Sequence, residues 1–190
     1  MRTHLRVVII ACSLLLLIAA AIYLPGYRPA TASVTVVTAN TNREAIGKLE
    51  SQAAMLKIYA EAKGFNSERC FMIDMSIPSG KQRFFVYNFS TDKIEEAGLV
   101  THGSGSITGK QELFFSNVPG SNCTSLGRYK IGKPYRGRFG LAYKLFGLDE
   151  TNSKAFERFV VLHSHGCVPN REVYPLPICP SLGCPTVAPA

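Results

Sequence analysis

Cys184 stands near the C-terminus, in the run 181–185 (SLGCP), and has the residue type of a nucleophile. His163 follows the apolar segment 159–162, which predicts a buried strand. The intervening loop, 166–180, contains four prolines, so it is neither a helix nor a central strand. A histidine at a strand end and a cysteine on the returning loop can meet in space, as nucleophilic catalysis by a thiol requires.

The residues around this pair fit the same chemistry. The thiolate of Cys184 would attack an amide carbonyl, and His163 would pair with the thiolate and then protonate the leaving amine. Gly183 has no side chain and allows close approach, and the amides of residues 183 and 184 could donate to the oxyanion. A backbone carbonyl or a hydroxyl, such as that of Ser164 or Ser181, would orient the imidazole.

Other interpretations of these residues stay open. Cys184 could be a structural or disulfide cysteine, and His163 could be an interior histidine. Zinc is the sharpest rival, because five candidate ligands lie within 22 residues: His163, His165, Cys167, Cys179 and Cys184. Their spacing matches no compact zinc knuckle and export favours disulfides, so we expect no metal and no other cofactor. His102 is either a loop residue or a support for the site.

The N-terminus predicts export. Arg2 and Arg6 precede an uncharged run, 7–24, and residues 30–32 (ATA) have the small-residue pattern of a signal-peptidase site. The run is also long enough to span a bilayer. Residues 1–32 are therefore expected to be a signal peptide or an N-terminal membrane anchor, and both interpretations place the rest of the chain outside the cytoplasm.

The cysteines and the charge limit the compartment and the partners. Cys12 lies in the export segment, so pairing four of the other five cysteines would leave one free thiol. Cys167 and Cys179, which flank the proline-rich loop, are the most credible pair. The net charge is +8, and three of these positive charges come from arginines in residues 1–28. The remainder is too small to indicate nucleic acid but suits an acidic polymer such as a carboxylate-rich cell wall.

The rest of the chain predicts a mainly β domain with one helix. Residues 33–42 predict a linker or an edge strand. Apolar residues at three- and four-residue spacing predict an amphipathic helix over 43–63 that is stopped by Gly64 and packs across a sheet. Short strands are predicted at 70–77, 83–89, 93–103, 126–132, 139–146 and 158–163. Without βαβ alternation, a sandwich or a barrel is expected.

Taken in order, these segments resemble the murein L,D-transpeptidase catalytic domain (the YkuD-like superfamily), in the branch whose nucleophile motif ends Gly-Cys-Pro. The resemblance spans about residues 45–188. It rests on RFFVYNF (83–89), His102-Gly103, FFSNVPGSNCTSLGRY (114–129), the run 135–163 and SLGCPTV (181–187). A serine, one further residue and Gly-Cys, with a histidine about twenty residues upstream, form the superfamily's signature.

The resemblance implies an L,D-transpeptidase-like domain over residues 43–190, with peptidoglycan stem peptides as substrate, in the bacterial periplasm or cell envelope. The Cys184 thiolate would attack the third residue of a stem tetrapeptide, the terminal D-alanine would leave, and a second stem's amine would resolve the thioester into a 3→3 cross-link. Water as acceptor would make the enzyme a carboxypeptidase. The implied catalytic residues are Cys184, His163, Ser181 and Gly183, and the implied substrate-binding residues are His102, Ser164 and Arg158.

Three departures from the family pattern stand out. Leu182 replaces a common histidine, and Pro185 replaces an arginine thought to grip a substrate carboxylate. Family members continue beyond the cysteine with a helix and a closing strand, so we expect these elements to be missing, the sheet edge unpaired and the cysteine loop weakly supported. Two alternatives remain: a catalytically impaired cell-wall-binding protein on the same fold, and another thiol hydrolase or sortase-like transpeptidase.

Overall fold

The computed structural model describes residues 34–108 and 112–189, and the chain divides into two compact units at the boundary between Gly47 and Lys48. The predicted export segment, residues 1–32, lies outside the described residues. Within the described ranges, no helix is both long enough and apolar enough to cross a membrane.

Helix α2 runs from Val34 to Ala62, so it begins earlier than the predicted residue 43. The edge strand considered for 33–42 is wrong for residues 34–42, which are helical. No proline or glycine lies between Val34 and Ile46, and the β-branched residues in this stretch cost a helix only a few tenths of a kcal/mol each. The predicted end is confirmed, since Gly64 follows the helix with a left-handed φ of 64°.

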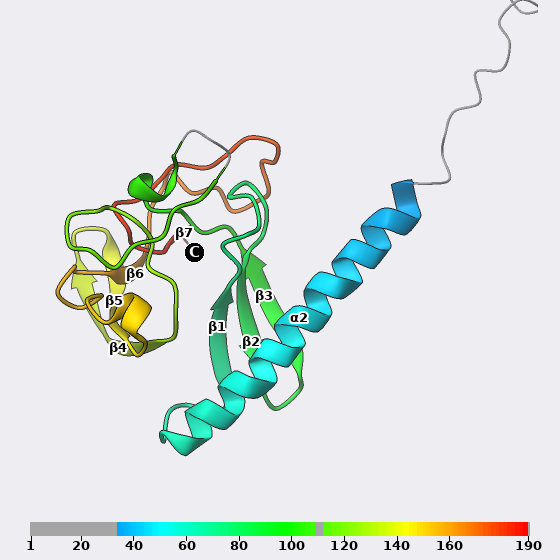
Figure 1. Ribbon diagram of the computed structural model, residues 1–190, viewed down its shortest axis with the longest axis horizontal. Coiled ribbons are helices and arrows are strands. Elements are labelled where there is room, and N and C mark those ends of the chain that lie inside the picture. The colour runs from blue at the N-terminus through cyan, green and yellow to red at the C-terminus, as the bar shows by residue number, and fades with distance from the viewer. Residues whose placement is uncertain (1–33, 109–111, 190) are drawn as a thin grey trace, which may run out of the picture. The chain divides into compact units, whose positions relative to one another are not determined.

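A three-stranded antiparallel meander packs against the second half of α2 (Figure 1). It contains β1 (Arg69–Ile73), β2 (Phe84–Asn88) and β3 (Lys93–Gly98), in the order β1-β2-β3. The buried residues between the helix and the sheet are Leu49, Ala53, Met72, Phe85, Tyr87 and Phe89. This contact confirms that the amphipathic helix covers a sheet.

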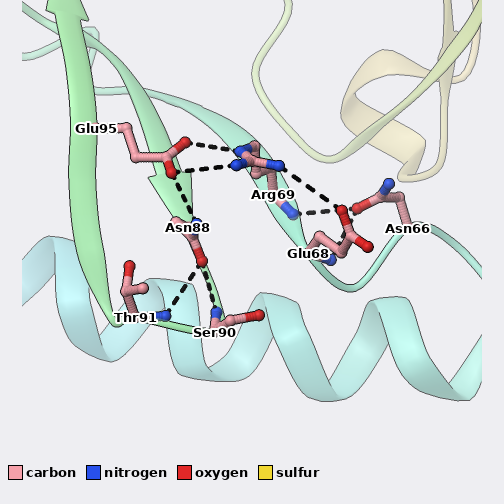
Figure 2. A network of polar contacts seen from close by, with 7 residues as sticks. All are labelled: Asn66, Glu68, Arg69, Asn88, Ser90, Thr91 and Glu95. Carbon is pink, nitrogen blue, oxygen red and sulfur yellow. Dashed lines mark hydrogen bonds and ion pairs between the residues drawn. The ribbon is translucent and has the colours of Figure 1, made fainter.

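A polar network on the same sheet links all three strands (Figure 2). Glu95 on β3 accepts from Arg69 Nε on β1 and from Asn88 Nδ2 on β2, both at 2.7 Å. Asn88 also caps the turn to β3 by accepting from the N–H groups of Ser90 and Thr91. Because the Arg69–Glu95 pair is exposed to solvent, we expect it to fix register more than to add stability.

The second sheet carries the segments that the sequence marked for chemistry. It contains β4 (Tyr129–Gly137), β5 (Gly140–Gly147), β6 (Val161–Ser164) and β7 (Thr186–Val187), in that order. Strands β4, β5 and β6 pair antiparallel, and β6 pairs with β7 in parallel. Two short 3₁₀ helices, Ser104–Ser106 and Glu150–Asn152, complete the regular structure of the described residues. The predicted class, mainly β with one helix, is confirmed.

The segment after Cys184 is paired on both sides. On one side Thr186 and Val187 form β7 against His163 and Ser164. On the other side Val187 bridges Val100, and the Thr101 N–H donates to the Thr186 carbonyl at 3.0 Å. The expectation of an unpaired edge beside the cysteine loop is therefore wrong, because residues 100–101 supply the second neighbour.

Candidate active site

A tight turn presents Cys184, and hydroxyl groups hold its backbone. The Ser181 hydroxyl donates to the Cys184 carbonyl at 2.7 Å and accepts the Gly183 N–H at 3.1 Å. The Thr101 hydroxyl donates to the same carbonyl at 3.1 Å. The Ser181 N–H donates to the His102 carbonyl at 2.8 Å, which fastens the start of the turn to the segment after β3. Ser181 therefore positions Cys184 through its hydroxyl and its backbone.

Gly183 is required by conformation and by contact. Its φ is 110°, a region that favours glycine. A Cβ added there would lie 2.9 Å from the Cys123 carbonyl oxygen and 3.4 Å from Arg158 Nη2. The close approach expected at this glycine is thus made by the protein's own backbone.

Arg158 holds the loop behind the cysteine turn. Its Nη1 donates to the Ser116 carbonyl at 2.9 Å and to Ser125 Oγ at 3.1 Å, and its Nη2 donates to the Cys123 carbonyl at 2.6 Å. With these acceptors inside the protein, the guanidinium orients the same Cys123 carbonyl that Gly183 packs against. This placement favours a positioning role over the predicted substrate contact.

The Cys184 thiol is half-buried, with Sγ 3.8 Å from the Phe159 carbonyl oxygen. Burial raises the pKa of this thiol above its ordinary value, and the Val161 N–H and the charge of Arg158 offset part of that rise. The thiol is therefore predominantly protonated near neutral pH, and attack on a carbonyl requires a base.

His163 lies on the central strand β6 with both ring nitrogens engaged. Nδ1 lies 3.0 Å from the Ser164 carbonyl oxygen, which can only accept, so Nδ1 carries the proton. In the neutral form of the ring Nε2 then holds the lone pair, and it lies 3.1 Å from Thr186 Oγ1. The Phe139 ring stacks on the imidazole with centroids 4.9 Å apart. The expected orientation by a backbone carbonyl is thus provided by Ser164.

Thr186 lies at the paired position beside His163, two residues after Cys184. Among the described residues, no hydrogen bond joins the His163 ring to Cys184 Sγ. The Gly183 N–H already donates to Ser181 Oγ. Of the two expected oxyanion donors, only the Cys184 N–H therefore has no hydrogen-bond partner in the described part of the chain. Sequence reasoning missed Thr186, and its only signal was the alternation Cys184-Pro185-Thr186, which suits an extended segment.

His102 lies beneath the turn and is only 6% exposed. Its Nε2 faces the guanidinium of Arg83, which is fully buried and also donates to the Val100 and Ile77 carbonyls. Burial, and then the Arg83 charge, lower the pKa of His102 to about 4. A neutral, buried ring whose own carbonyl holds Ser181 supports the site from behind, and this position does not favour substrate contact.

The pKa of His102 predicts acid-sensitive folding. The unfolded chain binds a proton at this histidine below about 6.5, whereas the folded chain does so only below about 4. The stabilisation is complete above pH 6.5 and is lost as the pH falls from 6.5 to 4, about 3 kcal/mol in all. Arg83, with a pKa of about 10, stays charged throughout.

Urea unfolding at several pH values and constant ionic strength measures this slope. His102→Gln, which keeps an acceptor for Arg83 without titrating, should flatten the pH dependence between 4 and 6.5. The control is His165→Gln at an exposed histidine, which should retain the slope. An unchanged slope in His102→Gln would assign the titration to another group.

One disulfide, Cys167–Cys179, closes the loop between the two candidate residues, as predicted. The thiols of Cys70, Cys123 and Cys184 are free, so among the described cysteines there is no second disulfide of the kind that would have left a single free thiol. Cys70 packs beside the α2 core, whereas Cys123 lies behind the cysteine turn. Within the described ranges no three candidate side chains gather around a common metal position, and the disulfide takes up two of the five proposed zinc ligands.

A hollow of about 800 Å³ borders the cysteine turn, residues 181–184. It is lined mainly by apolar side chains of α2, β1 and β4, together with Arg69, Arg128 and Lys130, and it reaches the backbone at Gly183 and Pro185. The residues flanking Cys184 therefore connect the cysteine turn to a recess that is lined mainly by apolar side chains and carries some positive charge.

Residues 41–190 match the family model described as the L,D-transpeptidase catalytic domain, and the chain belongs to that family. Comparison with curated proteins and with solved structures gave no match. The family defines an enzyme of the transferase class that acts on cell-wall peptidoglycan.

Proposed function

We propose that the chain is an exported peptidoglycan L,D-transpeptidase in which Cys184 is acylated by a stem tetrapeptide and His163 transfers the proton. The observation that carries the proposal is the turn 181–184 of a family member, whose backbone is held by the Ser181 hydroxyl and which precedes the strand paired with His163, a histidine oriented by the Ser164 carbonyl. Export over residues 1–32 and action in the cell envelope belong to the same proposal, since the substrate lies outside the cytoplasm.

The reaction follows from these groups. His163 Nε2 takes the thiol proton and the sulfur bonds to the carbonyl carbon of the third stem residue, while the Cys184 N–H donates to the oxyanion. The C–N bond to D-alanine breaks, and the imidazolium returns the proton to the leaving amine. An acceptor amine then attacks the thioester, forms the new amide and releases the thiol. Water in its place gives the tetrapeptide carboxypeptidase product.

This series of steps requires the hydrogen bond between His163 Nε2 and Thr186 Oγ1 to break. Catalytic hydrogen bonds are often long in a free enzyme and tighten only with substrate bound. A single rotation of the Thr186 hydroxyl, toward the Cys184 carbonyl at 3.4 Å, frees Nε2. The remaining roles are positioning: Ser181 and Gly183 shape the turn, Arg158 and His102 support it, and Ser164 orients the base.

Acyl-enzyme trapping tests the proposal. The protein is incubated with a purified disaccharide tetrapeptide, quenched in acid and analysed by intact mass and peptide mapping. We expect an adduct on Cys184 that lacks the terminal D-alanine, and free D-alanine in solution. Unmodified protein with unchanged muropeptides would exclude the enzyme.

A binding protein on the same fold is the second candidate. The hydrogen bond between Thr186 Oγ1 and His163 Nε2 favours it, because this nitrogen is then engaged by a hydroxyl and makes no hydrogen bond to the thiol among the described residues. Retained binding to purified sacculi without D-alanine release would establish this alternative.

A further inference from the structure

Two turns in the described part of the chain are closed by the same pattern of two backbone hydrogen bonds. After α2, the Phe65 N–H donates to the Ala60 carbonyl (2.8 Å) and the Gly64 N–H to the Glu61 carbonyl (3.1 Å). Before β6, the Val160 N–H donates to the Ala155 carbonyl (2.9 Å) and the Phe159 N–H to the Phe156 carbonyl (3.1 Å). This is the Schellman motif, which requires a left-handed residue at the position of Gly64 and Phe159.

Phe159 is an unsuitable residue for that position. Its φ is 56°, where a bulky L-residue is strained, whereas Gly64 adopts 64° without penalty. The other non-glycine residues with positive φ in the described ranges are Asp92 and Asn122, which tolerate this conformation. Burial does not offset the strain, because Phe159 is 84% exposed. Neither the backbone nor the core explains a phenylalanine here.

The strained residue lies next to the nucleophile. The Phe159 carbonyl oxygen is 3.8 Å from Cys184 Sγ, and its neighbour Arg158 supports the cysteine turn. On the turn itself Leu182, two residues before the thiol, is 76% exposed. Both segments that flank the sulfur thus carry a large apolar side chain that is exposed to solvent.

We infer that Phe159 is a specificity-determining residue whose ring, with Leu182, forms an apolar subsite for the hydrocarbon part of the group that binds at Cys184. The identity of that group as a stem-peptide residue rests on the proposed function. The apolar preference is a property of the thiol's surroundings and holds for any electrophile that reacts there. Backbone strain at Phe159 is retained because the ring contacts the ligand.

Phe159→Gly tests both halves of the inference. Relief of the left-handed strain should raise Tm by about 2–4 °C in thermal unfolding. Loss of the ring should lower the preference of Cys184 for N-phenylmaleimide over N-methylmaleimide, which share one reactive group. We expect the ratio of their rate constants, measured at Cys184 by peptide mass spectrometry, to fall by about 2- to 10-fold. Phe159→Tyr should retain the wild-type ratio.

Gly64→Phe is the matched control, because it places the same residue in the same motif away from the thiol, where an added Cβ has open space. It should shift the unfolding equilibrium constant by about 5- to 30-fold toward the unfolded state and leave the reagent ratio unchanged. A more stable Phe159→Gly with an unchanged ratio overturns the subsite, and a less stable one overturns the strain argument.

The two reagents contain no peptide, so the ratio is measured whether or not the protein acts on peptidoglycan. If Phe159→Gly lowers the reagent ratio but the wild-type protein releases no D-alanine from a tetrapeptide, the subsite is supported and the transpeptidase activity is rejected. If the enzyme is active, Phe159→Gly should raise KM for the tetrapeptide more than it lowers kcat. A purely structural role for Phe159 would leave both KM and the reagent ratio unchanged.

Discussion

Cys184→Ala is expected to reduce D-alanine release from a stem tetrapeptide by about 10³-fold or more, and to remove the acyl-enzyme adduct completely. The reason is that every covalent step passes through this sulfur, and alanine retains the turn while offering no nucleophile. The hydroxyls of Ser181 and Thr101 hold the residue through its backbone carbonyl, so the substitution should leave the turn folded. Released D-alanine in a coupled oxidase assay is the measurement.

The chain supplies its own controls in the other two free thiols, Cys70 and Cys123. Cys70→Ala changes a thiol packed beside the α2 core, and Cys123→Ala changes a buried one behind the turn. Each should retain wild-type turnover per folded molecule. Residual activity in Cys184→Ala, together with a loss of activity in either control variant, would show that another cysteine is the nucleophile.

His163→Gln is expected to lower kcat/KM for the same donor by about 10²- to 10⁴-fold. Burial keeps the Cys184 thiol protonated at neutral pH, so without the imidazole the reactive thiolate becomes scarce. Rates measured from pH 6 to 10 should show the defect shrinking at alkaline pH, where solvent hydroxide deprotonates the thiol. A defect of equal size at every pH would show that His163 does not act as the base.

His165→Gln is the matched substitution for this experiment. His165 lies two residues further along and meets the edge of the same Phe139 ring, but it is exposed, and its Nδ1 accepts the Cys167 N–H. Its replacement should change kcat/KM by less than about threefold, within the usual context dependence of a surface polar group. The opposite order of effects would exchange the roles of the two histidines.

Much of the fold could be predicted because the local signals agree with the packing. Gly64 ended the helix where the periodicity ended, and the alternating strands of the meander were separated by polar turns. The helix start could not be predicted, because nothing between Val34 and Ile46 forbids or requires a helix. Strand β7 is two residues long, and its pairing with Val100 and β6 depends on neighbours that are far away in sequence.

The site was less predictable than the fold. Residue type made Cys184 and His163 candidates, and it predicted the Cys167–Cys179 pair, since a proline-rich loop between two cysteines brings its ends together. The direction of a side chain is a tertiary property, however. His102 turned inward to Arg83, and His163 met Thr186 instead of the thiol, because strand register and buried charge decide these contacts. No spacing in the sequence encodes either one.

The Cys167–Cys179 disulfide has a consequence for how the two candidate residues stay together. Along the backbone, 20 residues lie between His163 and Cys184, but through the sulfur bridge only three lie between His163 and Cys167 and four between Cys179 and Cys184. A shorter tether lowers the entropy available to the ends when the intervening loop opens. The disulfide therefore keeps the imidazole and the thiol at a high effective concentration relative to each other when the loop opens locally. This constraint requires an oxidising compartment, in which the disulfide forms.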